Sequence, residues 1–151
     1  MRSFTAKPRS SALRPFVKSF HYHEAELPFT LERIVPNGQA HLMVNLAEDE
    51  FRSYHGVGAD QICKYSGAVV AGPHAKSVVI DTQAQRWLAA VEFRQGGASR
   101  FFPMPMIEMS NQIVQLQAVW RKGGHLRERL LDARTPESKF RALEEVLLGL
   151  S

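Results

Sequence analysis

The spacing of apolar residues along the chain changes near residue 95. Before that point apolar residues alternate with others: in HLMVNL (residues 41–46), Leu42, Val44 and Leu46 occupy every second position. A period of two is that of a strand with one buried face. Later in the chain, apolar residues recur every three or four positions, as in a helix. The pattern therefore predicts strands over about residues 13–95 and helices over about 97–150.

Other segments of the first part share this strand character. They are short, rich in β-branched and aromatic residues, and bounded by turn residues such as Gly72 and Pro73. Several short strands of this kind favour a barrel or a sandwich. The further predicted strands are residues 15–23 (PFVKSFHYH), 68–72 (AVVAG), 77–82 (SVVIDT) and 86–93 (RWLAAVEF).

The second part predicts three helical segments. Ser110 suits the N-cap of a helix that continues to Trp120. The last helix has the clearest start, because Thr135 suits an N-cap and Pro136 the first helical position. The middle segment carries an apolar stripe of Leu126, Leu130 and Leu131, and the last one a stripe of Phe140, Leu143, Val146, Leu147 and Leu150.

Strands followed by helices, without alternation between the two, predict an α+β fold. We expect an antiparallel β-barrel followed by a C-terminal helical layer. The length of 151 residues fits a single domain, 1–151, with one core.

Composition narrows the class of protein further. The lone Cys63 cannot form an internal disulfide, and the sequence shows neither a leader peptide nor a long apolar segment. We therefore expect a cytoplasmic protein without a membrane segment. Lys and Arg exceed Asp and Glu by only 19 to 15, and acidic residues interrupt most basic stretches, so charge does not indicate a nucleic-acid surface.

A metal site is one candidate chemistry. The spacing P-x-G-x-x-H-x-x-x-N across residues 36–45 resembles the second motif of metal-binding cupin barrels, and it includes His41. His21, His23 and Glu26 could add further ligands, since two histidines and a carboxylate suit a divalent metal.

Strand parity argues against that site. If Leu42 and its alternate neighbours claim the buried face, His41 turns the other way, whereas a ligand inside a barrel must point inward. Residues 36–38 (PNG) have a simpler role, because Pro followed by Asn and Gly suits a tight turn. We therefore expect a turn here and no bound metal.

Catalytic patterns are missing from the sequence. It contains neither a Gly-x-Ser-x-Gly elbow nor a phosphate-binding loop, so we expect no enzymatic activity, no catalytic residue and no cofactor. The helices of residues 126–150 are also unsuited to bind DNA as a helix-turn-helix motif. The acidic residues of the last helix, Glu137, Glu144 and Glu145, outnumber its basic residues. We expect this chain alone not to bind DNA specifically.

Six blocks follow one another along the sequence: LRPFVKSFHYHE, ERIVPNGQAHLMVNL, VVAGPHAKSVVID, VEFRQGGASRFFPMP, EMSNQIVQL and LRERLLDARTPESKFRALEEVLL. In this order they resemble the N-terminal sensor domains of AraC-type transcriptional regulators. The resemblance implies a cupin-like barrel that receives a small-molecule effector, helices that mediate homodimerisation, and a helix-turn-helix DNA-binding domain beyond Ser151. We therefore expect an excised sensor domain, with a stand-alone metal-dependent cupin enzyme or binding protein as the alternative.

Residues for these two roles follow from strand faces and helix stripes. Trp87, Val91 and Phe93 share one strand face and are expected to line an effector cavity, with Tyr22 and Arg33 as polar contacts. The final apolar stripe is expected to dock on its own chain. For the homodimer we expect the shorter stripe of Leu126, Leu130 and Leu131.

Overall fold

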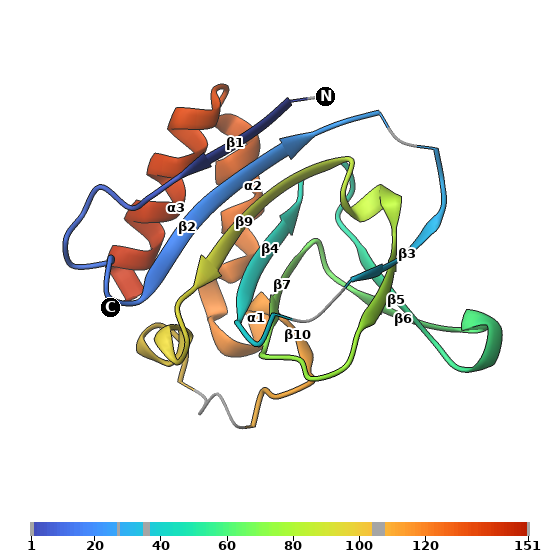
Figure 1. The fold of residues 1–151 in the computed structure, drawn as a ribbon. Coiled ribbons are helices and arrows are strands. Elements are labelled where there is room, and N and C mark those ends of the chain that lie inside the picture. Colours follow the sequence, from blue (N-terminus) through green and yellow to red (C-terminus); the bar gives the residue numbers. More distant parts are fainter. Residues whose placement is uncertain (1, 27, 35–36, 104–107, 151) are drawn as a thin grey trace.

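A computed structural model describes residues 2–26, 28–34, 37–103 and 108–150. Two antiparallel sheets face each other, and a layer of helices from the C-terminal third covers the outer face of the larger sheet (Figure 1). This arrangement confirms the α+β prediction, with antiparallel strands first and helices after them. The strand pairings join the described strands into two separate sheets and do not close them into one barrel.

The six-stranded sheet has the order β1-β2-β9-β4-β7-β10, and the four-stranded sheet has the order β3-β8-β5-β6. The strands are β1 (Arg2–Ala6), β2 (Val17–Glu24), β3 (Leu31–Ile34), β4 (His41–Asn45), β5 (Phe51–His55), β6 (Gln61–Tyr65), β7 (Ala68–Ala71), β8 (Val78–Asp81), β9 (Trp87–Phe93) and β10 (Ile113–Gln115).

The helical layer consists of one short and two longer α-helices, and short 3₁₀ turns lie between strands and between α1 and α2. Among the described residues, no helix combines the length and the apolar character needed to cross a bilayer. The helices are α1 (Leu116–Val119), α2 (Gly124–Asp132) and α3 (Pro136–Leu150), and the 3₁₀ turns are η1 (Val57–Ala59), η2 (Thr82–Ala84), η3 (Gly97–Arg100) and η4 (Arg121–Gly123).

The main core lies between the six-stranded sheet and the helices. Val91 and Phe93 of β9 and Leu143 and Leu147 of α3 are all 0% exposed. Burying such a side chain contributes roughly 1.5–3 kcal/mol each. This helix-to-sheet contact is therefore the main stabilising layer, and it confirms that the final apolar stripe docks on its own chain.

A second, smaller apolar cluster lies between the two sheets. Phe51 of β5 and Val69 of β7 are buried there, and Met43, Ile80 and Ile113 pack against them. The six-stranded sheet is thus covered on both faces, by helices on one side and by the four-stranded sheet on the other. Alternate residues of its central strands consequently enter two different environments.

The start of α3 agrees with the sequence. The Thr135 hydroxyl accepts a hydrogen bond from the backbone N–H of Ser138 at 3.1 Å, which satisfies one of the free amide groups at the helix start. Pro136 is the first helical residue, as predicted. Local sequence signals alone were sufficient at this position because capping involves residues only three apart.

The segment 110–120 differs from its prediction as one helix. Ile113–Gln115 forms strand β10, which pairs with β7, and only Leu116–Val119 is helical. A strand forms here because the backbone N–H and C=O groups at the edge of β7 need partners, and a helix at Ile113 could not provide them. The change brings Ile113 into the space between the sheets.

Candidate functional site

A cavity of about 210 Å³ lies between the two sheets. Most of its lining is apolar, with polar side chains from His41 of β4 and from the connecting loops, which is the usual composition of a small-molecule site. Its walls come from β3 and β8 on one side and from β4, β7 and β10 on the other. The lining residues are Ile34, Asn37, Gln39, His41, Met43, Ala71, Gly72, His74, Lys76, Val78, Ile80 and Ile113.

His41 faces this cavity because of the two-sided burial of β4. Leu42 and Val44 point into the helical core and are at most 1% exposed, so His41 and Met43 point toward the four-stranded sheet. The alternation along β4 agrees with the sequence, but the prediction rested on the assumption that the most apolar face forms the barrel interior. That assumption is wrong, because the most apolar face lies under the helices.

The His41 side chain is largely uncharged at neutral pH. Burial lowers the pKa of its imidazole below the ordinary value of 6.5, although the carboxylate of Glu92, which lies opposite His41 in the β4–β9 register, acts against that shift. A neutral imidazole carries one donor and one acceptor nitrogen. His41 can therefore orient a polar group of a bound molecule without requiring it to be charged.

His74 supplies a second imidazole on the cavity wall. Its Nδ1 atom lies 2.7 Å from the carbonyl oxygen of Gly72. Because a carbonyl oxygen can only accept, Nδ1 must carry a proton in this contact, and the ring keeps Nε2 for a further hydrogen bond. The cavity thus presents two imidazoles to a bound molecule.

A polar network on β2 and β9 supports the His41 side of the cavity. The Glu92 carboxylate accepts a hydrogen bond from Asn37 Nδ2 at 3.3 Å and lies 3.7 Å from Lys18 Nζ. His21 Nε2 is 3.4 Å from the same carboxylate. The network fixes Asn37, whose side-chain oxygen in turn accepts from the Gln39 backbone N–H at 3.0 Å and so shapes the loop at the cavity mouth.

The turn expected at residues 36–38 lies partly outside the described residues, which omit Pro36. Gly38 has a φ of 74°, the left-handed conformation that glycine adopts without strain. Within the described residues, no three His, Cys, Asp or Glu side chains converge as metal ligands. The expectation of a metal-free protein stays a prediction.

The aromatic residues expected to line the cavity lie on the opposite face of the six-stranded sheet. Val91 and Phe93 are buried under the helices, and Trp87 packs against the same core. Trp87 Nε1 donates to the hydroxyl of Tyr22 at 2.8 Å. Sequence reasoning therefore grouped Tyr22 with Trp87 correctly but assigned the pair to the wrong side of the sheet.

A buried lysine, Lys139, lies against this aromatic pair. The Lys139 side chain of α3 is 3% exposed, and its ammonium group lies 5.8 Å from the Tyr22 ring and 5.6 Å from the Trp87 ring. It donates to the carbonyl oxygens of Leu130, at 2.7 Å, and of Ala133, at the end of α2. Burial lowers the pKa of Lys139. The Lys139 side chain therefore connects α2, α3 and the sheet, and its role is structural.

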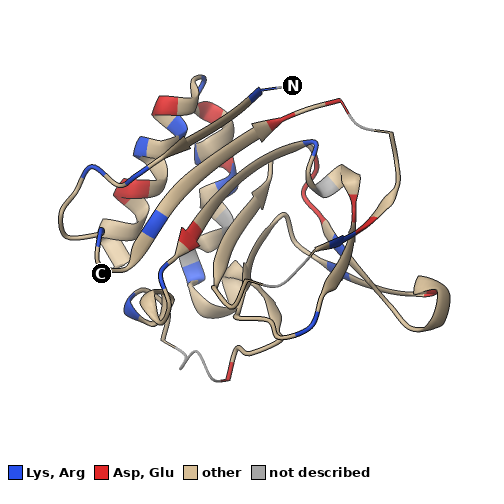
Figure 2. Cartoon of the chain, in the orientation of Figure 1, with Lys and Arg blue, Asp and Glu red and all other residues tan. Residues whose placement is uncertain are grey.

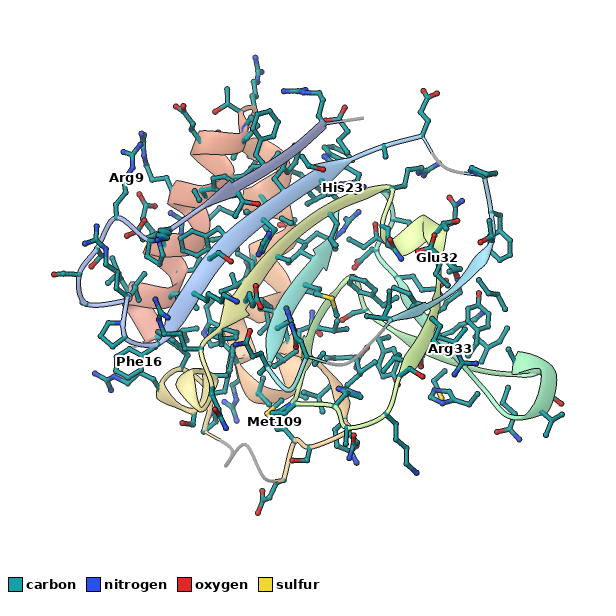
Figure 3. The ribbon with its side chains drawn as sticks, in the orientation of Figure 1. Arg9, Phe16, His23, Glu32, Arg33 and Met109 are labelled. Carbon is teal, nitrogen blue, oxygen red and sulfur yellow. The ribbon has the colours of Figure 1, made fainter. Side chains whose placement is uncertain are left out.

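Arg33 lies on β3, where it is exposed and donates to the Ser77 hydroxyl at 3.0 Å (Figure 3). Its neighbour Ile34 lines the cavity instead. A single-residue difference in register therefore separates the expected contact from the observed one.

The expected dimer stripe is not available on the surface. Leu126 and Leu130 are 1% and 0% exposed in the single chain, and Leu131 packs partly buried against the same core. These side chains stabilise the fold of their own chain, so a homodimer would have to use another surface.

The sequence did contain a signal for the cavity. AVVA (residues 68–71) is apolar at every position, which is typical of a strand covered on both faces. Two covered faces imply a second layer opposite the helices, and therefore a place for the residues that alternate with the most apolar ones. His74 and Ile113 gave no such signal, because their positions depend on how the loop and β10 fold back.

Gly72 marks a close contact at the end of β7. A Cβ atom added there would lie 1.9 Å from the backbone carbonyl oxygen of Met109. We expect Gly72→Ala to lower the free energy of unfolding by about 1–3 kcal/mol, because one backbone segment must move away from the other. Gly149→Ala in α3, with no atom within 4 Å of the new Cβ, is the control and should be neutral or slightly stabilising. Equal denaturation midpoints for wild type and Gly72→Ala would contradict the contact.

Comparison with known proteins gives a family but no described function. Neither a curated protein nor a solved structure matches the chain. Residues 6–115 match a family described as a domain of unknown function (DUF6597), and this range contains every strand that lines the cavity. Because the match covers well over half of the sequence, the chain belongs to the DUF6597 family.

Proposed function

We propose that this chain is the effector-sensing domain of an AraC-type transcriptional regulator, and that the cavity between its sheets receives the effector. The observation that carries the proposal is the cavity, in which Asn37, His41 and His74 supply hydrogen-bonding groups around a largely apolar interior. Two antiparallel sheets facing each other across a cavity also agree with the cupin-like arrangement that the sequence resemblance implies.

The polar groups of the cavity suit binding and orientation of a small molecule. His41 and His74 each offer a ring nitrogen for hydrogen bonding, and Gln39 Oε1 is buried without a hydrogen-bond partner among the described residues. An unsatisfied buried acceptor is costly, so a ligand that brings a donor to this wall, after a small side-chain movement, would gain affinity. At about 210 Å³ the cavity fits a molecule smaller than a typical drug.

In this proposal DNA is read by a separate helix-turn-helix domain, and the sensor domain transmits the state of its cavity. The helical layer rests on the same six-stranded sheet whose other face lines the cavity, so a ligand and the helices contact opposite sides of β4 and β7. An effector that shifts these strands would alter the packing of α1 and α2. The expectation that the chain alone does not bind DNA specifically remains part of this proposal.

A matched pair of substitutions on β8 tests the cavity. Val78 points into it, and the adjacent Val79 points to the opposite face of the four-stranded sheet. We expect Val78→Phe to fill the cavity and to abolish the stabilisation that a small-molecule ligand gives, while Val79→Phe retains it. A bound ligand at a hundredfold excess over its Kd should add about 2.7 kcal/mol to the stability of the wild type.

The measurement is a thermal-shift screen of small metabolites, followed by calorimetric titration of each molecule that raises the Tm. The proposal requires at least one molecule whose Kd weakens strongly in Val78→Phe and stays unchanged in Val79→Phe. Ligands that bind both variants equally well would place the effector site elsewhere, and the absence of any ligand from a broad screen would count against a sensor role.

A further inference from the structure

The edge of the six-stranded sheet formed by β1 has a free side. Within the described residues β1 pairs with β2 alone, and residues 2–5 are all exposed. In an antiparallel pair, alternate residues of an edge strand direct their backbone N–H and C=O groups away from the sheet. The free side of β1 therefore offers a row of hydrogen-bonding groups to an additional strand.

Beside this edge lies a groove of about 630 Å³ between β1 and the first half of α3. Its central part is aromatic. Phe140 of α3 stacks on Phe20 with ring centroids 6.1 Å apart, and Phe4 is 40% exposed next to them. Phe20 itself is buried, but an apolar segment placed along β1 would cover Phe4 and contact the partly buried ring of Phe140. This contact gives the added strand a hydrophobic contribution besides its backbone hydrogen bonds.

Cationic side chains flank the aromatic centre. Arg2 lies at one end of β1, Lys7 and Arg9 follow its other end, and Arg141 projects from α3. Figure 2 shows Lys and Arg at both ends of β1, and Figure 3 labels Arg9 beside the loop that leads to β2. Arg2 is 3.6 Å from Glu24, whereas the other three form no ion pair within the described part of the chain.

The acidic residues of the groove do not cancel this charge. Glu144 accepts hydrogen bonds from the backbone N–H groups of Arg9 and Ser10, which ties the loop after β1 to α3. Glu137 remains as the other carboxylate on the groove wall. Four cations and two carboxylates, one of them already bound to two amides, leave a positive rim around an apolar centre.

We propose that this groove binds an extended acidic peptide segment, which adds to β1 as a further antiparallel strand. Apolar residues of the segment cover Phe4 and Phe140, and carboxylates at its two ends meet Arg2 on one side and Lys7, Arg9 and Arg141 on the other. A second copy of this chain fits less well, because pairing β1 with its own copy would bring like charges together. The surface is separate from the cavity between the sheets.

The test uses the whole 151-residue chain and a defined probe, a capped seven-residue peptide with two glutamates at each end and three valines between them. We expect a Kd below about 1 mM by titration, with amide shifts in NMR spectra at residues 2–6 and 137–144. The same peptide with lysine in place of glutamate should bind at least about tenfold more weakly, and added salt should weaken the glutamate peptide.

Two further comparisons separate charge from backbone pairing. Lys7→Glu with Arg141→Glu should weaken the glutamate peptide at least about tenfold, whereas Lys64→Glu with Arg121→Glu, at exposed positions outside the groove, should not. A peptide N-methylated at its valines should also bind at least about tenfold more weakly, because it loses the donors that an added strand needs.

The proposal fails if the glutamate peptide shows no binding up to about 1 mM. It also fails if the lysine and glutamate peptides bind alike, or if the groove variants leave the Kd unchanged. Binding that survives N-methylation would overturn the strand addition. Melting temperatures of both double variants close to that of the wild type would confirm that a lost interaction is not a folding defect.

Discussion

Replacing Leu130 with alanine should lower the free energy of unfolding by about 2–5 kcal/mol, the range for a fully buried leucine. Leu130 lies near the end of α2 and is 0% exposed in the main core. The substitution removes apolar contact area and leaves a void that the packed helices can close only in part. Urea denaturation followed by circular dichroism measures the loss.

The same substitution at Leu148, which is 39% exposed on α3, is the control and should cost much less. The pair also tests the expectation that Leu130 belongs to a dimer interface. If it did, the apparent stability of the wild type would rise with protein concentration, and Leu130→Ala would remove that dependence. A concentration-independent loss at Leu130 would establish its role within the single chain, whereas similar small losses at both positions would contradict the observed burial.

Replacing Asp81 with asparagine should cost about 3 kcal/mol at neutral pH, because it breaks a buried ion pair. Asp81 is 1% exposed and accepts from Arg52 Nε at 2.7 Å, from the Tyr54 hydroxyl at 2.6 Å and from the Gln83 backbone N–H at 3.0 Å. The expected loss lies at the lower end of the range for such pairs, because Arg52 keeps its contacts with two further carboxylates, those of Glu48 and Glu50. Asp60→Asn, at an exposed position, is the control.

The pH dependence gives this prediction a second measurement. Burial acts to raise the pKa of Asp81, but the hydrogen bonds from Arg52 and Tyr54 outweigh it, so the net pKa lies below the ordinary value of 3.8. The folded state therefore binds fewer protons at this group than the unfolded chain does. The resulting stability is fully present above the unfolded pKa and is lost as the pH falls through the folded one.

The difference in unfolding free energy between wild type and Asp81→Asn should consequently shrink as the pH is lowered below about 4. Denaturation curves at a series of pH values from neutral to strongly acidic measure it. A difference that stays constant over this range would show that the cost of the substitution comes from shape and packing and not from the carboxylate charge.

Local patterns in the sequence predicted the elements whose own residues carry a clear period or a clear helix start. The alternation in residues 41–46 identified β4, and the signals at Thr135 and Pro136 located the start of α3 within one residue. Both patterns are visible in residues at most a few positions apart. The change of period near residue 95 similarly separated strands from helices. The α+β class and the C-terminal helical layer followed from these local features.

The structure of segment 110–120 could not be predicted from its own residues. Its apolar spacing suits a helix, but Ile113 enters a strand because β7, more than 40 residues earlier, has an unpaired edge at that place. Short polar strands such as β1 and β6 were likewise missed, since their stability comes from pairing with a neighbour and not from their own composition. The spacing of apolar residues within a short segment does not show which distant strand that segment pairs with.

The faces of the strands were decided by the tertiary structure alone. The sequence showed that Val91 and Phe93 lie on one side of β9 and that His41 lies opposite Leu42, and both statements hold. Which side meets the helices and which meets the cavity depends on where two other layers pack. The largest side chains lie under the helices because that interface buries the greater apolar area. The other face of the six-stranded sheet, with smaller and more polar side chains, meets the four-stranded sheet. The cavity that His41 and His74 line lies between these two sheets.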